Sequence, residues 1–331
     1  MAVRLEWRSI IVCLAVAGAI VVLVVLALMT GSYPLSPAQV ISALAGGETS
    51  LIHDIVVEWR LPRVAAAVVF GAALGVSGAI FQSLLRNPLA DPGIIGFSQG
   101  AYTGALIVIL LVNGSYLQLV AGALVGGVAT AVAVYVLAYR RGAQGFRMIV
   151  VGIGISAMLG SLNTWLILKA DLDQALAAAA WGAGSLNGVS WDQVVIGGAC
   201  IVVLVPLAAS LSRPMRQMEL GDDSAAAQGV RVAPIRLALI VVAVALTATV
   251  TAASGPIAFI SLVAPQIGRR LARTAGITLA PAAFIGALLC LLADYIAQHA
   301  APTPLPVGII TVILGGGYLG WLLFVEGRRR L

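Results

Sequence analysis

Long apolar runs alternate with short polar segments along the chain. A helix needs about 20 apolar residues to cross a bilayer core of roughly 30 Å, and most of the runs are about that long. They cover residues 9–30, 63–84, 94–112, 117–138, 148–168, 193–211, 236–254, 257–272, 278–299 and 306–325. The first is longer than the roughly 7 to 15 residues of a secretory signal core, so we expect it to be retained. The pattern predicts an all-α polytopic membrane protein, with about ten transmembrane helices in one domain over residues 1–331.

Composition excludes a water-soluble globule. Hydrophobic residues make up 61% of the 331 positions and charged residues only 10%, whereas a soluble domain has about 25% charged residues. No separate soluble catalytic domain fits, so the chain is not expected to be an enzyme. The 37 glycines suit a bundle in lipid, where small residues let helices approach closely. Gly71 with Gly75, and Gly122 with Gly126, have the spacing of such packing contacts.

Cysteine and histidine give no sign of a metal site or of a cofactor bound by this chain. Cys13, Cys200 and Cys290 lie in apolar runs and lack C-x-x-C spacing, so neither a disulfide framework nor a metal knuckle is predicted. His53 and His299 are far apart in sequence. The glycines at 152–154 lie inside an apolar run, so they do not form a dinucleotide fingerprint, which requires a preceding strand.

The basic residues set the predicted topology. With ten spans and a cytoplasmic N-terminus, 16 of the 19 basic residues fall on the inside and only Arg60, Arg63 and Lys169 fall outside. This distribution obeys the positive-inside rule. Removing the short run at 257–272 would place the arginines at 328–330 outside, so charge supports keeping that run as a span. Both termini are therefore predicted to be cytoplasmic.

Two connections are too long and polar to be simple turns, and ordered loops often carry function. One is the outer segment 31–62 and the other is the inner segment 212–235. In the inner segment, Asp222 and Asp223 suit a helix start and Gly229 suits a helix end. The predicted short helix either docks into a groove on another protein or lies at the membrane interface. The turn at 86–92 contains two prolines, which exclude a continuous helix.

Asp294 is the one ionisable side chain predicted to lie well inside a span. An intramembrane carboxylate indicates proton or cation coupling by default. No second acid, lysine or arginine is predicted at that depth, so a structural role, such as bonding the end of a broken helix, is preferred. Ser161, Asn163 and Thr164 give the run at 148–168 a mildly polar face. That face either lines an aqueous path or bonds a neighbouring helix.

Several blocks together resemble the permease subunits of bacterial iron-siderophore and cobalamin ABC importers. The blocks are RLPR at 60–63, GAALGVSG at 71–78, QSLLRNPLADP at 82–92, LGDDSAAAQGV at 220–230, SLVAPQIGRR at 261–270 and LPVG at 305–308. The resemblance implies a bacterial inner-membrane protein that imports its ligand by alternating access. It also implies a second permease subunit, two ATP-binding cassette ATPase subunits that bind ATP and Mg, and a periplasmic or lipoprotein binding protein.

The resemblance also assigns roles to individual positions. Arg60 and Arg63 match outer arginines that dock the binding protein, and arginine forks suit paired carboxylates. Asn87 and Pro88 match a structural turn. Path-lining positions are Met158, Ser161, Asn163 and Trp165. Positions that couple to the ATPase are Leu220, Gly221, Asp222, Asp223, Ala226 and Gly229. The chain departs from the family at Gln266, where histidine is typical, and at Gln298, where the cobalamin permease has an outer arginine.

Three further blocks point to the ligand. FRMIVVGIG at 146–154, NTWL at 163–166 and WGAGSLNG at 181–188 look most like ferric enterobactin permeases within the family. They imply a ferric siderophore of the catecholate class and a paralogous second permease, although an identical second subunit stays open. The alternatives are cobalamin or heme as the ligand, or an ion-coupled secondary transporter that uses Asp294.

Overall fold

The computed structural model describes residues 7–47, 50–93, 96–112, 114–138, 144–276 and 278–329. Within these ranges the regular structure is entirely helical. Arg4, Arg140, Arg141 and Arg330, which contribute to the charge argument above, lie outside the described residues.

Each of the ten predicted spans corresponds to a helix. These helices are α1 (Trp7–Met29), α4 (Leu61–Leu85), α5 (Phe97–Ile107) continued by the π-helical η2 (Val108–Val112), α6 (Tyr116–Ala138), α7 (Gln144–Lys169), α9 (Trp191–Ser210), α12 (Val232–Ser254), α13 (Ile260–Ala272), α14 (Leu279–His299) and α15 (Val307–Arg329). Seven candidate spans among the described residues are long and apolar enough to cross a membrane, and Phe97–Val112 and Val307–Leu322 are shorter apolar helices. The prediction of an all-α polytopic bundle is confirmed.

Shorter helices occupy the connections. The outer segment holds α2 (Pro37–Leu44), α3 (Ser50–His53) and the π-helical η1 (Asp54–Arg60), which runs directly into α4. Ser36 begins α2 with a capping box, in which its side chain and that of Gln39 bond each other's backbone N–H. α8 (Leu172–Gly182) follows α7. The inner segment forms α10 (Ser212–Glu219) and α11 (Asp222–Ala227).

α4 is the centre of the bundle. In the apolar span that includes α4, 78% of the residues in the most apolar stretch are buried, whereas the corresponding share for the span of α7 is 11%. α4 lies against α14 through glycines: a Cβ on Gly75 would lie 2.1 Å from the carbonyl oxygen of Ala282, and one on Gly71 would lie 2.5 Å from that of Gly286. Gly122 and Gly126 make the same kind of contact between α6 and α5. The packing role predicted for both glycine pairs is confirmed.

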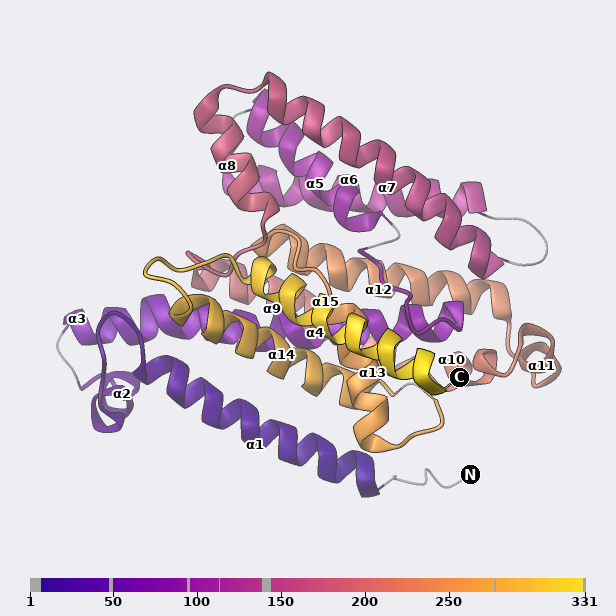
Figure 1. Cartoon of the computed structure of the whole chain (residues 1–331), viewed down its shortest axis with the longest axis horizontal. Helices are drawn as coiled ribbons and strands as arrows, with labels where there is room; N and C mark the ends of the chain where they lie inside the picture. Colours follow the sequence, from indigo (N-terminus) through magenta and orange to yellow (C-terminus); the bar gives the residue numbers. More distant parts are fainter. Residues whose placement is uncertain are drawn as a thin grey trace.

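The helices form two groups joined by α12. In Figure 1, α5 to α8 stand apart from the group that contains α1, α4, α13 and α14. α12 contacts α4 and α9 on one side and α5 and α6 on the other. α10 and α11 lie at the end where α1 begins and α15 ends, and α2 and α3 lie at the opposite end (Figure 1). The charge pattern predicts this placement of the inner segment at one end and the outer segment at the other. Which of the two ends faces the cytoplasm stays a prediction.

Candidate functional site

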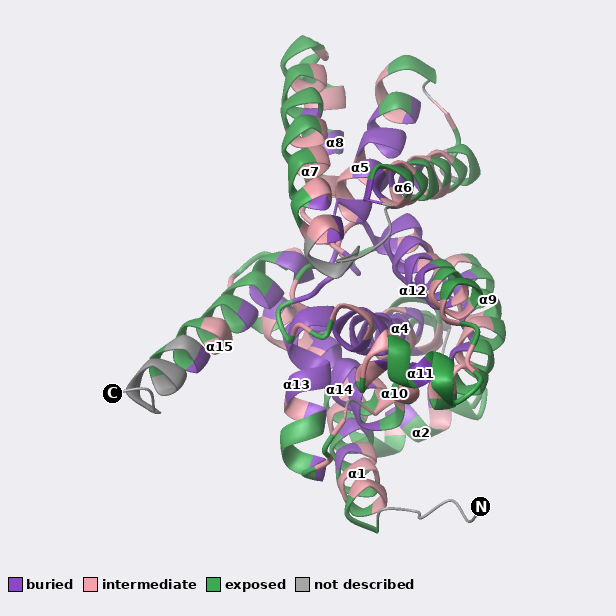
Figure 2. Ribbon diagram, turned by 90° about the vertical axis from the view of Figure 1, so that its right-hand side faces the viewer, coloured by how far each residue is buried: buried purple, intermediate pink, exposed green. Residues whose placement is uncertain are grey.

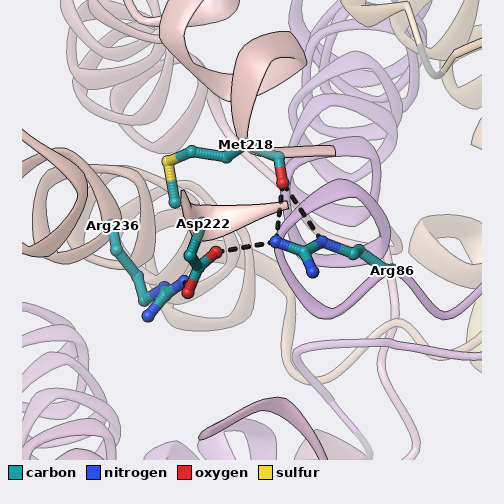
Figure 3. A network of polar contacts seen from close by, with 4 residues as sticks. All are labelled: Arg86, Met218, Asp222 and Arg236. Carbon is teal, nitrogen blue, oxygen red and sulfur yellow. Dashed lines mark hydrogen bonds and ion pairs between the residues drawn. The ribbon is translucent and has the colours of Figure 1, made fainter. Parts of the chain in front are cut away.

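A polar network fastens the inner segment 212–235 to the bundle. Arg86 ends α4 in a left-handed conformation, with φ 49°, and this turns its side chain toward α10 and α11. Its guanidinium donates from Nε and Nη2 to the carbonyl oxygen of Met218, at 3.1 and 2.7 Å. Nη2 also lies 2.7 Å from Oδ1 of Asp222. Arg236, in the first turns of α12, binds Oδ2 of the same carboxylate at 2.6 Å (Figure 3).

Asp222 is therefore the point at which α4, α11 and α12 meet. Burial alone would raise its pKa, but hydrogen bonds and charge from Arg236 and Arg86 outweigh burial and hold the pKa of Asp222 below its ordinary value. Ser83 adds a second tie between α4 and α10, because its hydroxyl donates to Oε1 of Glu219 at 2.6 Å. The sequence suggested topology-setting arginines here and gave no sign that Arg86 would share a carboxylate with Arg236.

The inner segment has one anchored face and one free face. Met215, Met218 and Ala225 are buried against the bundle. Leu220 is 73% exposed, and Asp223 and Ala226 are also exposed. Gly221 and Gly229 bound α11 with φ 119° and 86°, a region that favours glycine. The short helix predicted at 220–230 is thus confirmed at Asp222–Ala227. Its exposed face carries small side chains and the charged Asp223, with the apolar Leu220 beside it.

The turn after α4 is held by its own side chains and by α13. The side-chain oxygen of Asn87 accepts a hydrogen bond from the backbone N–H of Leu89 at 2.9 Å. Gln266 donates from Nε2 to the carbonyl oxygen of Pro88 at 2.8 Å. Gln266 therefore joins α13 to this turn through an N–H donor, a role that a histidine ring nitrogen at the same position can also perform.

The two outer arginines contact groups within the chain. Arg60 is only 8% exposed and donates to the carbonyl oxygens of Leu28 and Tyr33 at 2.7 and 2.6 Å. Nε of Arg63 lies 3.1 Å from Oδ2 of Asp294. The premise that Asp294 has no arginine at its depth was wrong, because Arg63, in the first turn of α4, lies beside the outer end of α14. Asp294 ties two continuous helices together rather than bonding a broken helix end.

Gln298, one turn beyond Asp294 on α14, donates to Oδ1 of Asn187 at 2.6 Å. It joins α14 to the loop after α8. This loop contact had no signal in the sequence, because residues 111 positions apart carry no shared motif.

The predicted path-lining positions divide between two faces of α7. Met158 and Trp165 are 73% and 55% exposed, and Ser161 on the same face is also exposed. Asn163 is only 3% exposed. It accepts a hydrogen bond from Thr103 at 2.7 Å and donates to the side chain of Gln99 at 3.1 Å, both on α5. Of the two alternatives left open for the polar residues of this span, Asn163 therefore follows the second, because it bonds a neighbouring helix; the path-lining role of the other three stays a prediction.

Through its hydrogen bond to Gln99, Asn163 holds a side chain that borders a cavity of about 530 Å³. The lining includes Gln99 on α5, Asp91 in the turn, Ser261 on α13 and Ile313 on α15. The hydroxyl of Ser261 donates to Oδ2 of the buried Asp91. The cavity thus lies where the α5 to α8 group meets α13 and α15, and its polar groups come from segments far apart in the sequence.

The described geometry defines a class of protein. It is an all-helical membrane permease with an anchored short helix at one end and a largely exposed span, α7, along one side (Figure 2). A solved structure of a metal-chelate type ABC transporter in an inward-facing conformation is similar over 96% of this chain and 99% of that chain, with a TM-score of 0.83 and 25% sequence identity. The fold is that of type II ABC importer permeases.

The chain belongs to the FecCD transport family, which residues 19–325 match. It is 48% identical to the ferric enterobactin transport system permease protein FepG of Escherichia coli (strain K12), over 98% of both chains. It is 35% identical to the iron(3+)-hydroxamate import system permease protein FhuG of Bacillus subtilis (strain 168), over 92% of this chain and 94% of the relative. It is thus a multi-pass inner-membrane permease subunit of an ABC importer, and the family resemblance seen in the sequence is confirmed.

Proposed function

We propose that this chain is the transmembrane subunit of an ATP-driven importer for a ferric siderophore of the catecholate class. The ligand class rests on the 48% identity to FepG, against 36% to the hemin transport system permease protein HmuU of Yersinia pestis over 82% of this chain. Cobalamin and heme are the runner-up ligands. ATP and Mg act in two partner ATPases, and this chain binds no nucleotide.

The observation that carries the mechanism is the pair of arginines on Asp222. The inner segment docks on an ATPase through its free face, which includes Leu220, Asp223 and Ala226. Movement of that segment is passed to α4 through Arg86 and to α12 through Arg236, because both bind one carboxylate. α12 contacts both helix groups. A displacement at Asp222 therefore changes the position of one group against the other, which is the motion that alternating access requires.

The exposed face of α7, with Met158, Ser161 and Trp165, faces the second permease subunit and the path between the two subunits. An apolar face of this size needs a partner or lipid around it. The second subunit is a paralogue or a second copy of this chain.

The outer segment 31–62 carries the docking surface for the substrate-binding protein. Arg60 and Arg63 have two roles in this proposal. They hold the segment and α4 in place, because Arg60 binds the carbonyl oxygens of Leu28 and Tyr33 and Arg63 binds Asp294. They also place positive charge at the outer end. The double substitution Arg60→Glu and Arg63→Glu is therefore expected to abolish uptake. The affinity for the binding protein measures the docking role, and assembly of the complex in detergent measures the structural role. Undiminished uptake would refute both roles.

The test of the function is uptake by the reconstituted complex. Proteoliposomes that hold this chain with its second permease, ATPases and binding protein should accumulate ferric enterobactin only when ATP is inside with the ATPases. The competing ion-coupled hypothesis makes the opposite prediction: transport persists without the ATPases and is lost with Asp294→Asn. Hemin or cobalamin uptake in place of ferric enterobactin would reassign the ligand and keep the ATP-driven mechanism.

A further inference from the structure

A second cavity, of about 560 Å³, shares no lining residue with the Asp222 network or with the first cavity. It is bounded by α1, α9, α10 and α14, at the end of the bundle that carries α10 and α11. Its walls are mostly apolar, with Leu14, Val205 and Phe284 among them. Leu14 is 67% exposed and Phe284 37% exposed, so the cavity opens on the apolar outer surface of the spans.

The lining also holds polar side chains. Ser9 and Ser212 already interact within the chain, and two other polar groups are left for a ligand. One is Arg216 on α10, which is exposed and makes no ion pair with any described residue. The other is the hydroxyl of Thr278, which is buried and has no hydrogen-bond partner among the described residues.

The unpartnered hydroxyl has a cause in the sequence. Thr278 is the N-cap residue of α14, and a threonine there ordinarily accepts a hydrogen bond from the backbone N–H of the second or third helical residue. The third helical residue is Pro281, which has no N–H. The side chain makes no capping bond, and a buried polar atom without a partner is costly. Thr278 is a lining residue of the cavity, so a ligand bound there can supply the missing hydrogen-bond partner.

We infer that this cavity is a binding site for an anionic phospholipid. The apolar walls receive an acyl chain, and the headgroup phosphate lies between the guanidinium of Arg216 and the hydroxyl of Thr278. Arginine is well suited to phosphate, and basic pockets between transmembrane helices bind acidic headgroups. The site is on an established membrane protein, at a span end, where a lipid headgroup lies. A free phosphate would use the polar pair alone and leave the apolar walls empty.

The experiment uses the assembled transporter, purified in detergent and mixed with phosphatidylglycerol or phosphatidylcholine of the same acyl chains. Native mass spectrometry counts the lipids retained. We expect phosphatidylglycerol to be retained preferentially, and Arg216→Gln to weaken its retention by about tenfold, as for one lost charge-assisted hydrogen bond. Thr278→Val should weaken it less. Inorganic phosphate at millimolar concentration should not displace the lipid.

Two matched variants keep the test decisive. Arg213→Gln removes an exposed arginine of the same helix that is absent from the cavity lining, and it should leave retention unchanged. Ala209→Phe fills the cavity from an exposed position on α9 and should reduce retention while the complex stays assembled. The proposal is overturned if Arg213→Gln matches Arg216→Gln, if the two lipids are retained equally, or if Ala209→Phe has no effect. Displacement by inorganic phosphate would identify a simple anion site instead.

Discussion

Arg63 and Asp294 form an ion pair between the beginning of α4 and the outer part of α14, with 3.1 Å between Nε and Oδ2. The Asp294 side chain is only 2% exposed and that of Arg63 18%. The same two helices are packed through Gly71 and Gly75 further along. The pair therefore lies at the outer end of the most extensive helix–helix contact among the described residues.

Removing either member of this pair should destabilise the chain. Arg63→Gln leaves the buried Asp294 carboxylate uncompensated, which costs about 3–5 kcal/mol. Asp294→Asn leaves the partly exposed Arg63 without its partner and should cost less. The double variant should lose less than the sum of the two, because it leaves no orphan charge. Thermal unfolding of the purified complex measures all three. Strictly additive losses would show that the two residues act independently.

Asp222→Asn should uncouple ATP hydrolysis from transport. The amide keeps the size of the side chain but loses the charge that holds Arg86 and Arg236, so α10 and α11 can move without displacing α4 and α12. We expect ATPase activity to persist in proteoliposomes while uptake per ATP falls several-fold. Asp223→Asn is the comparison variant: Asp223 is exposed on the docking face of the same helix and makes no ion pair with a described residue, so its loss should weaken ATPase binding and leave uptake per ATP unchanged. Equal behaviour of the two variants would remove the special role of Asp222.

The network should also respond to pH in one direction. Because the folded-state pKa of Asp222 lies below its ordinary value of about 3.9, the carboxylate stabilises the network fully above that ordinary value and the stabilisation is lost as pH falls through the lowered pKa. The hydrogen-exchange protection factors of residues 212–230, which are corrected for the intrinsic pH dependence of amide exchange, should thus be constant from neutral pH to about pH 5 and fall only in stronger acid. In Asp222→Asn this fall should be absent; its persistence would implicate Glu219 or Asp223.

Features that depend on residues close together in the sequence could be predicted from it, whereas contacts between distant positions could not. Apolar run length, with the charge pattern for the short run at 257–272, located a helix at each of the ten predicted runs. Local rules placed α11 between two glycines. Both features depend on neighbouring residues. The ion pair of Arg63 with Asp294 joins positions on two different helices. It was missed because Arg63 was assigned to the outer side, as a docking residue for the binding protein, and Asp294 to the interior of a span. The sharing of Asp222 by Arg86 and Arg236 depends on the left-handed end of α4, which no motif specifies. Asn163 lies on the buried side of α7 because of partners on α5.

Gly75→Ala should destabilise the bundle although alanine is the better helix former. A Cβ at this position would lie 2.1 Å from the carbonyl oxygen of Ala282, so α4 and α14 must separate, and overpacking of this kind costs about 1–3 kcal/mol. Gly198→Ala, inside α9, is the control: its Cβ would meet nothing within 4 Å, and the gain in helix propensity is about 0.8–1 kcal/mol at both sites. We therefore expect the thermal unfolding midpoint to fall for Gly75→Ala and to stay level or rise for Gly198→Ala. If both midpoints rise, the close approach of α4 and α14 does not limit stability.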